Sequence, residues 1–286
     1  MGILINKETK YMIHGITGNE GLFYAAQMMA NGADIVAGVT PGKGGEWVLD
    51  GKIPVFDLAS MAIEATGANA SIIFVPARFA PDAILEAADA GVELIICVTE
   101  GIPIKDVIRV KEILSRTKTR LIGPSSPGIL TPGESCAGVI PGDIIRPGKV
   151  GVVSRSGTLM YEILLGLEQA GKGVSTCVGL GGDAVLGTSL KDVVSLFQRD
   201  AQTEKIILVG EIGGNAEEEV AEYVRNQTTK PIIAIVAGQT APPGKQMGHT
   251  GAMIEWDSGI ARDKISALLA AGVNIAESLE EIPALL

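Results

Sequence analysis

Short apolar runs alternate with amphipathic stretches along the whole chain. The runs are bounded by Gly, Pro or polar residues and are rich in Ile and Val, which is typical of buried strands. They predict strands over residues 11–14, 34–39, 53–56, 71–75, 93–98, 120–122, 150–153, 174–178, 205–209, 231–236 and 273–275.

The stretches between these strands have the spacing of amphipathic helices, for example over residues 80–91, 103–116 and 215–227. Many end in glycine, a common helix stop. Strands that alternate with helices form βαβ units and parallel sheets. We therefore expect an α/β fold.

The alternation breaks once, in a segment rich in proline and glycine. This predicts a first domain over residues 1–125, a linker or structured loop over 126–149, and a second domain over 150–286. In open α/β sheets, ligands bind beyond the carboxyl ends of the strands. The loops that directly follow strands are therefore where function is expected.

Charge excludes one class of function. The 286 residues carry a net charge of −10, with 47% hydrophobic and 20% charged residues, and no stripe of Lys or Arg. A nucleic-acid-binding surface needs concentrated positive charge, so no nucleic-acid partner is expected. An anionic ligand would have to be held by backbone N–H groups and a few lysines.

Membrane, metal and disulfide features are not expected either. No apolar run reaches the ~20 residues that span a bilayer, and the N-terminus has no signal core. A cytoplasmic protein with no membrane partner is the prediction. Cys97, Cys136 and Cys177 are far apart and odd in number, which favours neither disulfides nor a zinc site.

Two glycine-rich loops follow strands in the first half. The loop 15-GITGNEG-21 precedes a helix and fits either a phosphate site or a tight turn. The loop 38-GVTPGKGG-45 presents Lys43 where a dinucleotide enzyme has an acid for the ribose. Lys43 suits a phosphorylated ribose or a pyrophosphate, or is a solvated surface lysine.

Further strand-to-loop junctions carry polar residues. In 98-VTEGIP-103, Glu100 faces a ligand or caps the next helix. The loop 154-SRSGT-158 is either an anion site or an ordinary N-cap. In 210-GEIGGN-215, Glu211 stands at a strand end beside glycines.

His249 is the candidate reactive residue. The chain has two histidines; His14 ends a strand and is expected to be packed, whereas His249 lies in a long loop of glycine, proline and small residues. It is either catalytic, with Glu211 as its partner, or a lone loop histidine. Residues 166–173 fail as a P-loop because Gly173 replaces the Ser or Thr. A nucleotide site is therefore expected on another chain.

The motifs GITGNEG, GVTPGKGG, VTEGIP, PGKVGVVSRSGTLMYE, GEIGGNAEEE and GKQMGHTGA occur in this order. With them the chain resembles the α subunits of succinyl-CoA synthetases over nearly its whole length. The resemblance implies a Rossmann-like CoA-binding domain followed by a flavodoxin-like ligase domain. It also implies a β subunit that binds Mg-ATP or Mg-GTP, in a heterodimer or heterotetramer.

The resemblance implies roles for particular residues. CoA would contact Thr17, Gly18, Asn19, Glu20, Lys43, Val98, Thr99 and Glu100. Tyr161 would lie near the acid, and Ser156, Gly157 and Thr158 would form a phosphate site. His249 would be phosphorylated and Glu211 would hold its ring. The implied reaction joins succinate and CoA, with a nucleoside triphosphate, through an acyl phosphate.

One departure leaves the acid open. The family usually has Asn-Cys or Asn-Ser where this chain has Ser125 and Ser126, so malate or another small dicarboxylic acid is an alternative substrate. A nicotinamide-dependent oxidoreductase is disfavoured by Lys43 and the missing ribose acid. A non-catalytic CoA-binding regulator is disfavoured because it has no need of His249 with Glu211.

Overall fold

The structure is a computed structural model that describes residues 2–227, 230–254 and 258–286. The chain divides into two compact units. The N-terminal unit holds Leu4–Gly142 and Val185–Gly187, and the C-terminal unit holds Asp143–Ala184 and Thr188–Leu286 with residues 2–3. The predicted domain limits at residues 125 and 150 stay a prediction. Every predicted strand is present, which confirms the α/β fold class.

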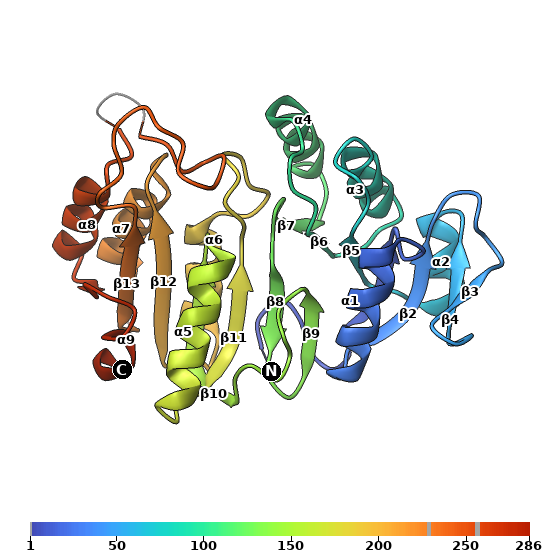
Figure 1. Ribbon diagram of the computed structural model, residues 1–286, viewed down its shortest axis with the longest axis horizontal. Helices are drawn as coiled ribbons and strands as arrows, with labels where there is room; N and C mark the ends of the chain where they lie inside the picture. The colour runs from blue at the N-terminus through green and yellow to red at the C-terminus, as the bar shows by residue number, and fades with distance from the viewer. Residues whose placement is uncertain (1, 228–229, 255–257) are drawn as a thin grey trace. The chain divides into compact units, whose positions relative to one another are not determined.

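The N-terminal unit is built on a parallel sheet (Figure 1). Its strands lie in the order β4-β2-β1-β5-β6-β7, which is 3-2-1-4-5-6 in chain order and therefore Rossmann-like. The short β3 pairs with β4 in the antiparallel sense at the edge. The strands are β1 (Lys10–His14), β2 (Asp34–Val39), β3 (Trp47–Val48), β4 (Ile53–Phe56), β5 (Ala70–Ile73), β6 (Leu94–Cys97) and β7 (Arg120–Ile122).

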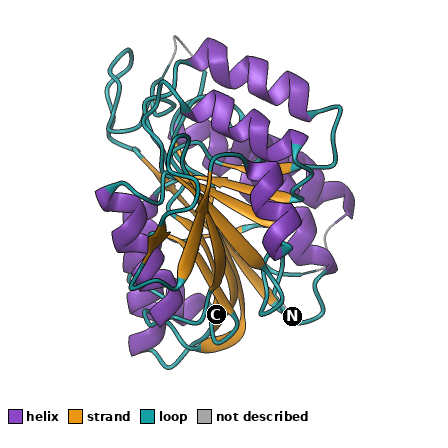
Figure 2. Cartoon of the chain, turned by 90° about the vertical axis from the view of Figure 1, so that its right-hand side faces the viewer, coloured by secondary structure: helices purple, strands orange, loops and turns teal. Residues whose placement is uncertain are grey.

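Helices cover both faces of this sheet, and Figure 2 shows helices flanking strands on either side. A buried cluster that includes Met12, Ile73 and Ile95 packs against α2, α3 and α4. From β1 the chain adds β2 on one side, and later adds β5, β6 and β7 on the other side. Because both kinds of crossover are right-handed, α1 lies on the opposite face of the sheet from α2, α3 and α4. The helices are α1 (Asn19–Ala30), α2 (Ala59–Thr66), α3 (Ala80–Asp89) and α4 (Ile104–Leu114).

The C-terminal unit has a second parallel sheet. Its strands lie in the order β11-β10-β12-β13-β14, which is 2-1-3-4-5 in chain order and therefore flavodoxin-like. All six residues of β11 are buried, as expected for a strand covered on both faces. The strands are β10 (Pro147–Ser154), β11 (Val174–Gly179), β12 (Lys205–Glu211), β13 (Ile232–Ala237) and β14 (Asn274–Ile275).

Side-chain caps set where two of its helices begin. The Ser156 hydroxyl accepts the N–H of Leu159, and Ser189 forms a capping box with Asp192. Such caps satisfy N–H groups that the first turn leaves without a helical partner. The helices are α5 (Gly157–Gln169), α6 (Leu190–Arg199), α7 (Ala216–Gln227), α8 (Ala261–Ala270) and α9 (Ile282–Leu285).

The sequence did not predict the hairpin of β8 (Gly128–Thr131) and β9 (Ser135–Gly138) in the segment read as a linker or structured loop. Both strands are short and begin or end at glycine, so the strand pattern is weak. Glycine is required where the two strands approach each other closely, because a Cβ on Gly128 would lie 2.0 Å from the carbonyl oxygen of Ala137. This hairpin therefore depends on close approach of the two backbones and not on the β-branched residues that usually mark a strand in a sequence.

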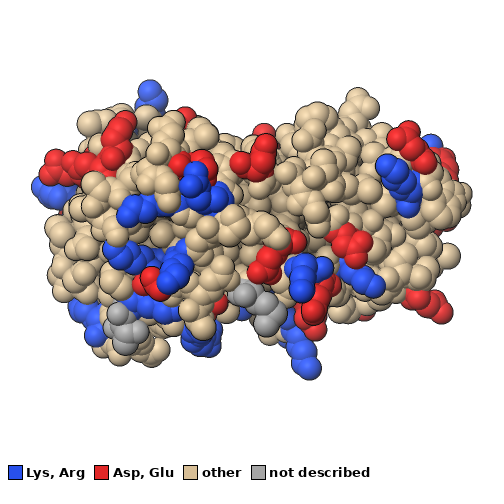
Figure 3. Space-filling view, turned by 90° about the horizontal axis from the view of Figure 1, so that it is seen from below, with Lys and Arg blue, Asp and Glu red and all other residues tan. Residues whose placement is uncertain are grey.

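The surface carries charged side chains of both signs. On the face shown in Figure 3, basic and acidic side chains form small mixed groups separated by uncharged surface. None of the helices in the described ranges combines the length and apolar character needed to cross a membrane. Cys97, Cys136 and Cys177 are all buried and form no disulfide.

Candidate functional site

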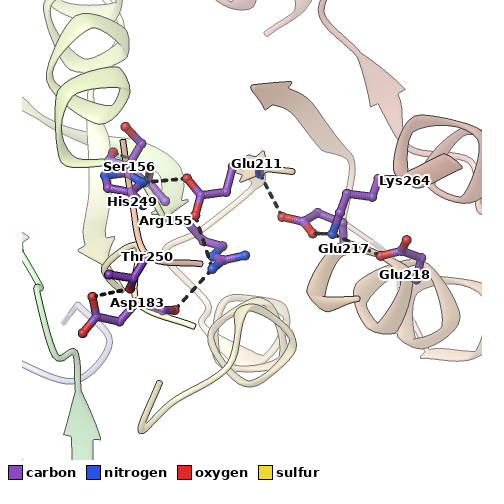
Figure 4. Close-up of polar contacts among 10 residues, drawn as sticks. Arg155, Ser156, Asp183, Glu211, Glu217, Glu218, His249, Thr250 and Lys264 are labelled. Carbon is purple, nitrogen blue, oxygen red and sulfur yellow. Dashed lines mark hydrogen bonds and ion pairs between the residues drawn. The ribbon is translucent and has the colours of Figure 1, made fainter. Parts of the chain in front are cut away.

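Glu211 and His249 meet at the carboxyl end of β12. The imidazole Nδ1 lies 2.7 Å from Glu211 Oε2 (Figure 4). Glu211 is buried, while the His249 side chain is 36% exposed. An ionised carboxylate can only accept, so Nδ1 donates, and in the neutral ring Nε2 keeps the lone pair. The structure therefore presents one ring nitrogen of His249 for reaction with a bound group.

The loop that carries His249 is held at defined points. The N–H of Met247 donates to the carbonyl of Ala252 at 2.8 Å, and the N–H of Gly251 donates to that of Gly182 at 2.9 Å. The ring lies against the backbone of Gly182, where a Cβ would approach its Cγ to 2.1 Å. This role of Gly182 was not predicted, although its loop, 179-GLGGDAVLG-187, is rich in glycine and follows a strand.

Two more charged residues adjoin this pair. Arg155 Nη2 lies 3.2 Å from Glu211 Oε1, and both side chains are almost fully buried. Asp183 accepts a 3.0 Å hydrogen bond from the Thr250 hydroxyl, next to His249 in the loop. Neither Arg155 nor Asp183 was predicted, because the hydroxyls of the SRSGT motif gave the stronger signal and Asp183 lies in a loop marked mainly by its glycines.

These charges act on His249 in opposite directions. The hydrogen bond with Glu211 raises the pKa of His249 above its usual value, against the effect of partial burial. The charges of Glu211 and Asp183 also raise this pKa, whereas that of Arg155 lowers it. The balance decides how much of the ring is neutral near pH 7.

The predicted phosphate-site residues begin α5. Ser156 is the buried N-cap residue, Gly157 is the first helical residue, and Thr158 is exposed. Tyr161 lies one turn further along and is partly exposed. A helix N-terminus presents N–H groups and positive potential to an anion. The start of α5 can thus bind phosphate, and the role of each residue stays a prediction.

The N-terminal unit has a cavity of about 770 Å³ where the strand order reverses between β1 and β5. Its lining includes Gly18, Asn19 and Glu20 from the first glycine loop. A second cavity of about 460 Å³ shares Glu20 with the first and is lined also by Val98, Thr99 and Glu100. The structure thus gathers most of the predicted CoA contacts around two adjoining hollows.

Thr17 and Lys43 are not among the residues that line either cavity. The Thr17 hydroxyl donates a 3.3 Å hydrogen bond to that of Thr40. Lys43 forms a 3.0 Å ion pair with Glu46, and both side chains are about half exposed (49% each). The exposed lysine can turn toward an anion at little cost, because surface ion pairs contribute only about 0–1 kcal/mol.

His14 lines the larger cavity and is packed, as expected. Its Nδ1 lies 2.9 Å from the Ser71 hydroxyl and its Nε2 lies 3.8 Å from Glu86. The pKa of Glu86 is lowered, first by its interaction with His14. Glu86 was not predicted, because it belongs to a helix whose pattern reads as an ordinary amphipathic face.

Two protein families match this chain, one in each half. Residues 6–101 match the CoA binding domain family, and residues 153–274 match the CoA-ligase family. The succinate–CoA ligase [ADP-forming] subunit alpha of Aquifex aeolicus is 52% identical over 284 residues, covering 99% of this chain and 92% of that protein. The subunit of the same name from Staphylococcus aureus (strain Mu50) is 50% identical over 282 residues, covering 99% and 93%.

Solved structures show the same fold. A mutant ATP citrate lyase from Methanosaeta concilii in complex with (3S)-citryl-CoA aligns with a TM-score of 0.89 at 24% identity, over 99% of this chain and 51% of that one. An acetyl-coenzyme A synthetase 1 from Ca. Korarchaeum cryptofilum, with phosphate and ADP, aligns with a TM-score of 0.77 at 20% identity, over 96% and 59%. This chain spans about half the length of those two. Given its close relatives along almost its full length, the chain belongs to the family of succinate–CoA ligase α subunits.

Proposed function

We propose that this chain is the α subunit of an ADP-forming succinate–CoA ligase and that His249 carries the phosphoryl group. The observation that carries the proposal is the 2.7 Å contact between His249 Nδ1 and Glu211 Oε2. It joins the only two residues for which we predict roles in catalysis. The names of the relatives support succinate as the acid and ADP as the nucleotide product.

The chemistry follows from the tautomer. With Nδ1–H donated to Glu211, His249 Nε2 attacks the terminal phosphorus of ATP and ADP leaves. The phosphoryl group then passes from Nε2 to a carboxylate oxygen of succinate, which gives succinyl phosphate. The thiol of CoA attacks the acyl carbon and phosphate leaves. The net products are succinyl-CoA, ADP and phosphate.

The positive end of α5 supports the charged intermediates. Ser156, Gly157 and Thr158 begin this helix, and its N–H groups can hold the phosphoryl oxygens. Tyr161, on the next turn, is proposed to lie near succinate. CoA is proposed to occupy the two hollows of the N-terminal unit, with Lys43 turned toward its phosphates.

The nucleotide is proposed to bind mainly to a β subunit, as Mg-ATP. The sequence has no P-loop, which supports a site on another chain. In the described part of the chain, no group of three or more His, Cys, Asp or Glu side chains could hold a metal ion. The proposed assembly is a heterodimer or a dimer of heterodimers.

The test is phosphorylation of the αβ complex with Mg-ATP labelled at the γ position, followed by intact-mass measurement. We expect one acid-labile phosphoryl group in the wild-type chain and in His14→Asn, and none in His249→Asn. Succinate with CoA should discharge the label as succinyl-CoA forms. Absence of label from a stable wild-type complex would overturn the proposal.

The choice of acid is tested on the same labelled complex. Succinate and malate differ by one hydroxyl, and a site that leaves this hydroxyl without a partner discriminates against it. We expect succinate with CoA to discharge the label faster than malate at equal concentration. The reverse order would assign the chain to a malate–CoA ligase.

A further inference from the structure

Arg155 lies buried behind the proposed phosphohistidine, and the mechanism above makes no use of it. Its Nη2 atom contacts Glu211 Oε1 at 3.2 Å and the carbonyl oxygen of Asp183 at 3.3 Å. The side chains of Arg155 and Glu211 are only 6% and 5% exposed. Burying a guanidinium is costly unless it is paired, so this placement needs a reason.

The two oxygens of Glu211 have separate partners. Oε2 is bonded to His249 Nδ1 at 2.7 Å, while Oε1 contacts Arg155 and accepts no hydrogen bond among the described residues. Arg155 therefore restrains the oxygen that the imidazole does not use. Figure 4 shows the contacts of Glu211 with both His249 and Arg155. With Oε1 restrained, rotation of the carboxylate is opposed and Oε2 stays directed at the ring.

Arg155 also lies against the loop that carries the histidine. A Cβ built on Gly251 would approach Arg155 Nη2 to 2.6 Å. The same glycine is anchored by its N–H to the carbonyl of Gly182 at 2.9 Å. The guanidinium of Arg155 thus contacts Glu211, which orients His249, and also lies next to the backbone of Gly251, two residues after His249.

The charges that act on His249 come from three elements. Glu211 ends β12, Asp183 lies between β11 and α6, and Arg155 lies between β10 and α5. The two carboxylates favour the imidazolium form, which has no lone pair for attack on phosphorus. Partial burial of the ring opposes them, and Arg155 is the charged group that does so.

We propose that Arg155 is a positioning residue for His249, which fixes Glu211 so that Nε2 is the reacting atom and whose positive charge counters the two carboxylates beside the ring. The inference rests on the proposed function of His249. In the step concerned, an Nε2–P bond forms as the P–O bond to ADP breaks. The Nδ1 proton remains on the ring or moves to Glu211, so no further base is required.

The first measurement is the NMR titration of the histidines in the full chain. Only two histidine signals are expected, and His14, in the other unit, provides an internal reference. Arg155→Gln should move the His249 titration midpoint upward, and Arg155→Lys should move it by less. Arg146→Gln is the matched control, because Arg146 pairs with Glu168 at the surface near the start of β10; it should move neither signal.

The second measurement is the pH profile of phosphohistidine formation in the αβ complex. Arg155→Gln should be slower by about tenfold near pH 7, with the deficit shrinking toward pH 9, and Arg155→Lys should recover part of the rate. An unmoved His249 midpoint, or a deficit that is independent of pH and not relieved by lysine, would overturn the proposal. If Arg155→Gln moved the His249 midpoint but the wild-type chain were never phosphorylated, the effect of Arg155 on His249 would stand. The proposed function would then be overturned instead.

Discussion

The backbone N–H of Glu211 donates a 3.0 Å hydrogen bond to Oε1 of Glu217, which ties the end of β12 to the first turn of α7. The other carboxylate oxygen of Glu217 is bonded to Lys264 Nζ, and both side chains are fully buried. Lys264 also reaches Glu218 at 3.3 Å. A Cβ on Gly210 would meet Glu217 Oε1 at 2.6 Å, so glycine is needed there. A buried ionic group therefore supports the strand end that presents Glu211 (Figure 4).

Removing the buried cation should destabilise the chain strongly. In Lys264→Met, Glu217 is left as a buried charge without its ammonium partner, and we expect a loss of about 3–5 kcal/mol in the free energy of unfolding. Adding Glu217→Gln removes that charge and should recover part of the loss. Urea denaturation measures both.

The control for this comparison is Lys149→Met. Its ion pair with Glu204 is exposed, so we expect a change of no more than about 1 kcal/mol. The free energy of unfolding lost in the double variant is compared with the sum of the losses in Lys264→Met and Glu217→Gln alone. If the two were equal, Glu217 and Lys264 would not act as a coupled pair.

Gly182→Ala should displace the His249 ring. The added Cβ would lie 2.1 Å from the ring's Cγ, so the ring has to move. Small misplacements of a reacting group are costly, and we expect phosphohistidine formation to slow by at least about tenfold. Rapid-quench labelling of the αβ complex gives the rate.

Gly166→Ala is the matched change for that experiment. Gly166 lies inside α5, and a Cβ added there would have Pro283 as its nearest neighbour, at 3.8 Å. Because alanine favours the helix over glycine, this variant should gain about 0.5–1 kcal/mol of stability and keep its rate of labelling. Equal rates in both variants would show that the ring tolerates displacement.

The His249–Glu211 pair should make stability depend on pH in one direction. Glu211 raises the pKa of His249, so the pair's contribution is fully present below the unfolded pKa of about 6.5 and is lost as pH rises through the folded pKa. The difference in unfolding free energy between the wild type and His249→Gln should therefore be larger at pH 5.5 than at pH 9. A difference that grew with pH would contradict this assignment.

Lys43 should affect CoA binding alone. Because its side chain is exposed and its ion pair with Glu46 lies at the surface, Lys43→Ala should leave stability unchanged. If it turns toward the phosphates of CoA, calorimetric titration should show binding weakened by about twofold to fivefold. Lys52→Ala, also at an exposed position, is the control and should bind CoA normally.

The periodic features of the fold could be predicted from the sequence. Apolar runs that alternate with helices gave the strands of both sheets, because buried parallel strands are uniformly apolar. The loops after strands made the pairing of His249 with Glu211 one of two alternatives, and the family resemblance implied it. In contrast, β8 and β9 depend on glycines that permit close approach of two chain segments, and such approach has no periodic signature.

The charged residues behind the site were not predictable in the same way. Lys264 belongs to a helix in which a lysine normally reaches solvent, yet it is fully buried. Arg155 lies among serines that gave a stronger signal as helix caps. In both cases the partner is distant along the chain, in another element, and only the folded sheet brings the two together.

The site around His249 takes its residues from the ends of β10, β11 and β12 and from the loop after β13. Its parts are brought together only when these strands are paired in order. A chain with a partly assembled sheet has the histidine but neither the carboxylate nor the guanidinium beside it. We therefore expect acquisition of the phosphoryl label during refolding to lag behind helix formation, which makes phosphorylation a chemical reporter of correct sheet assembly.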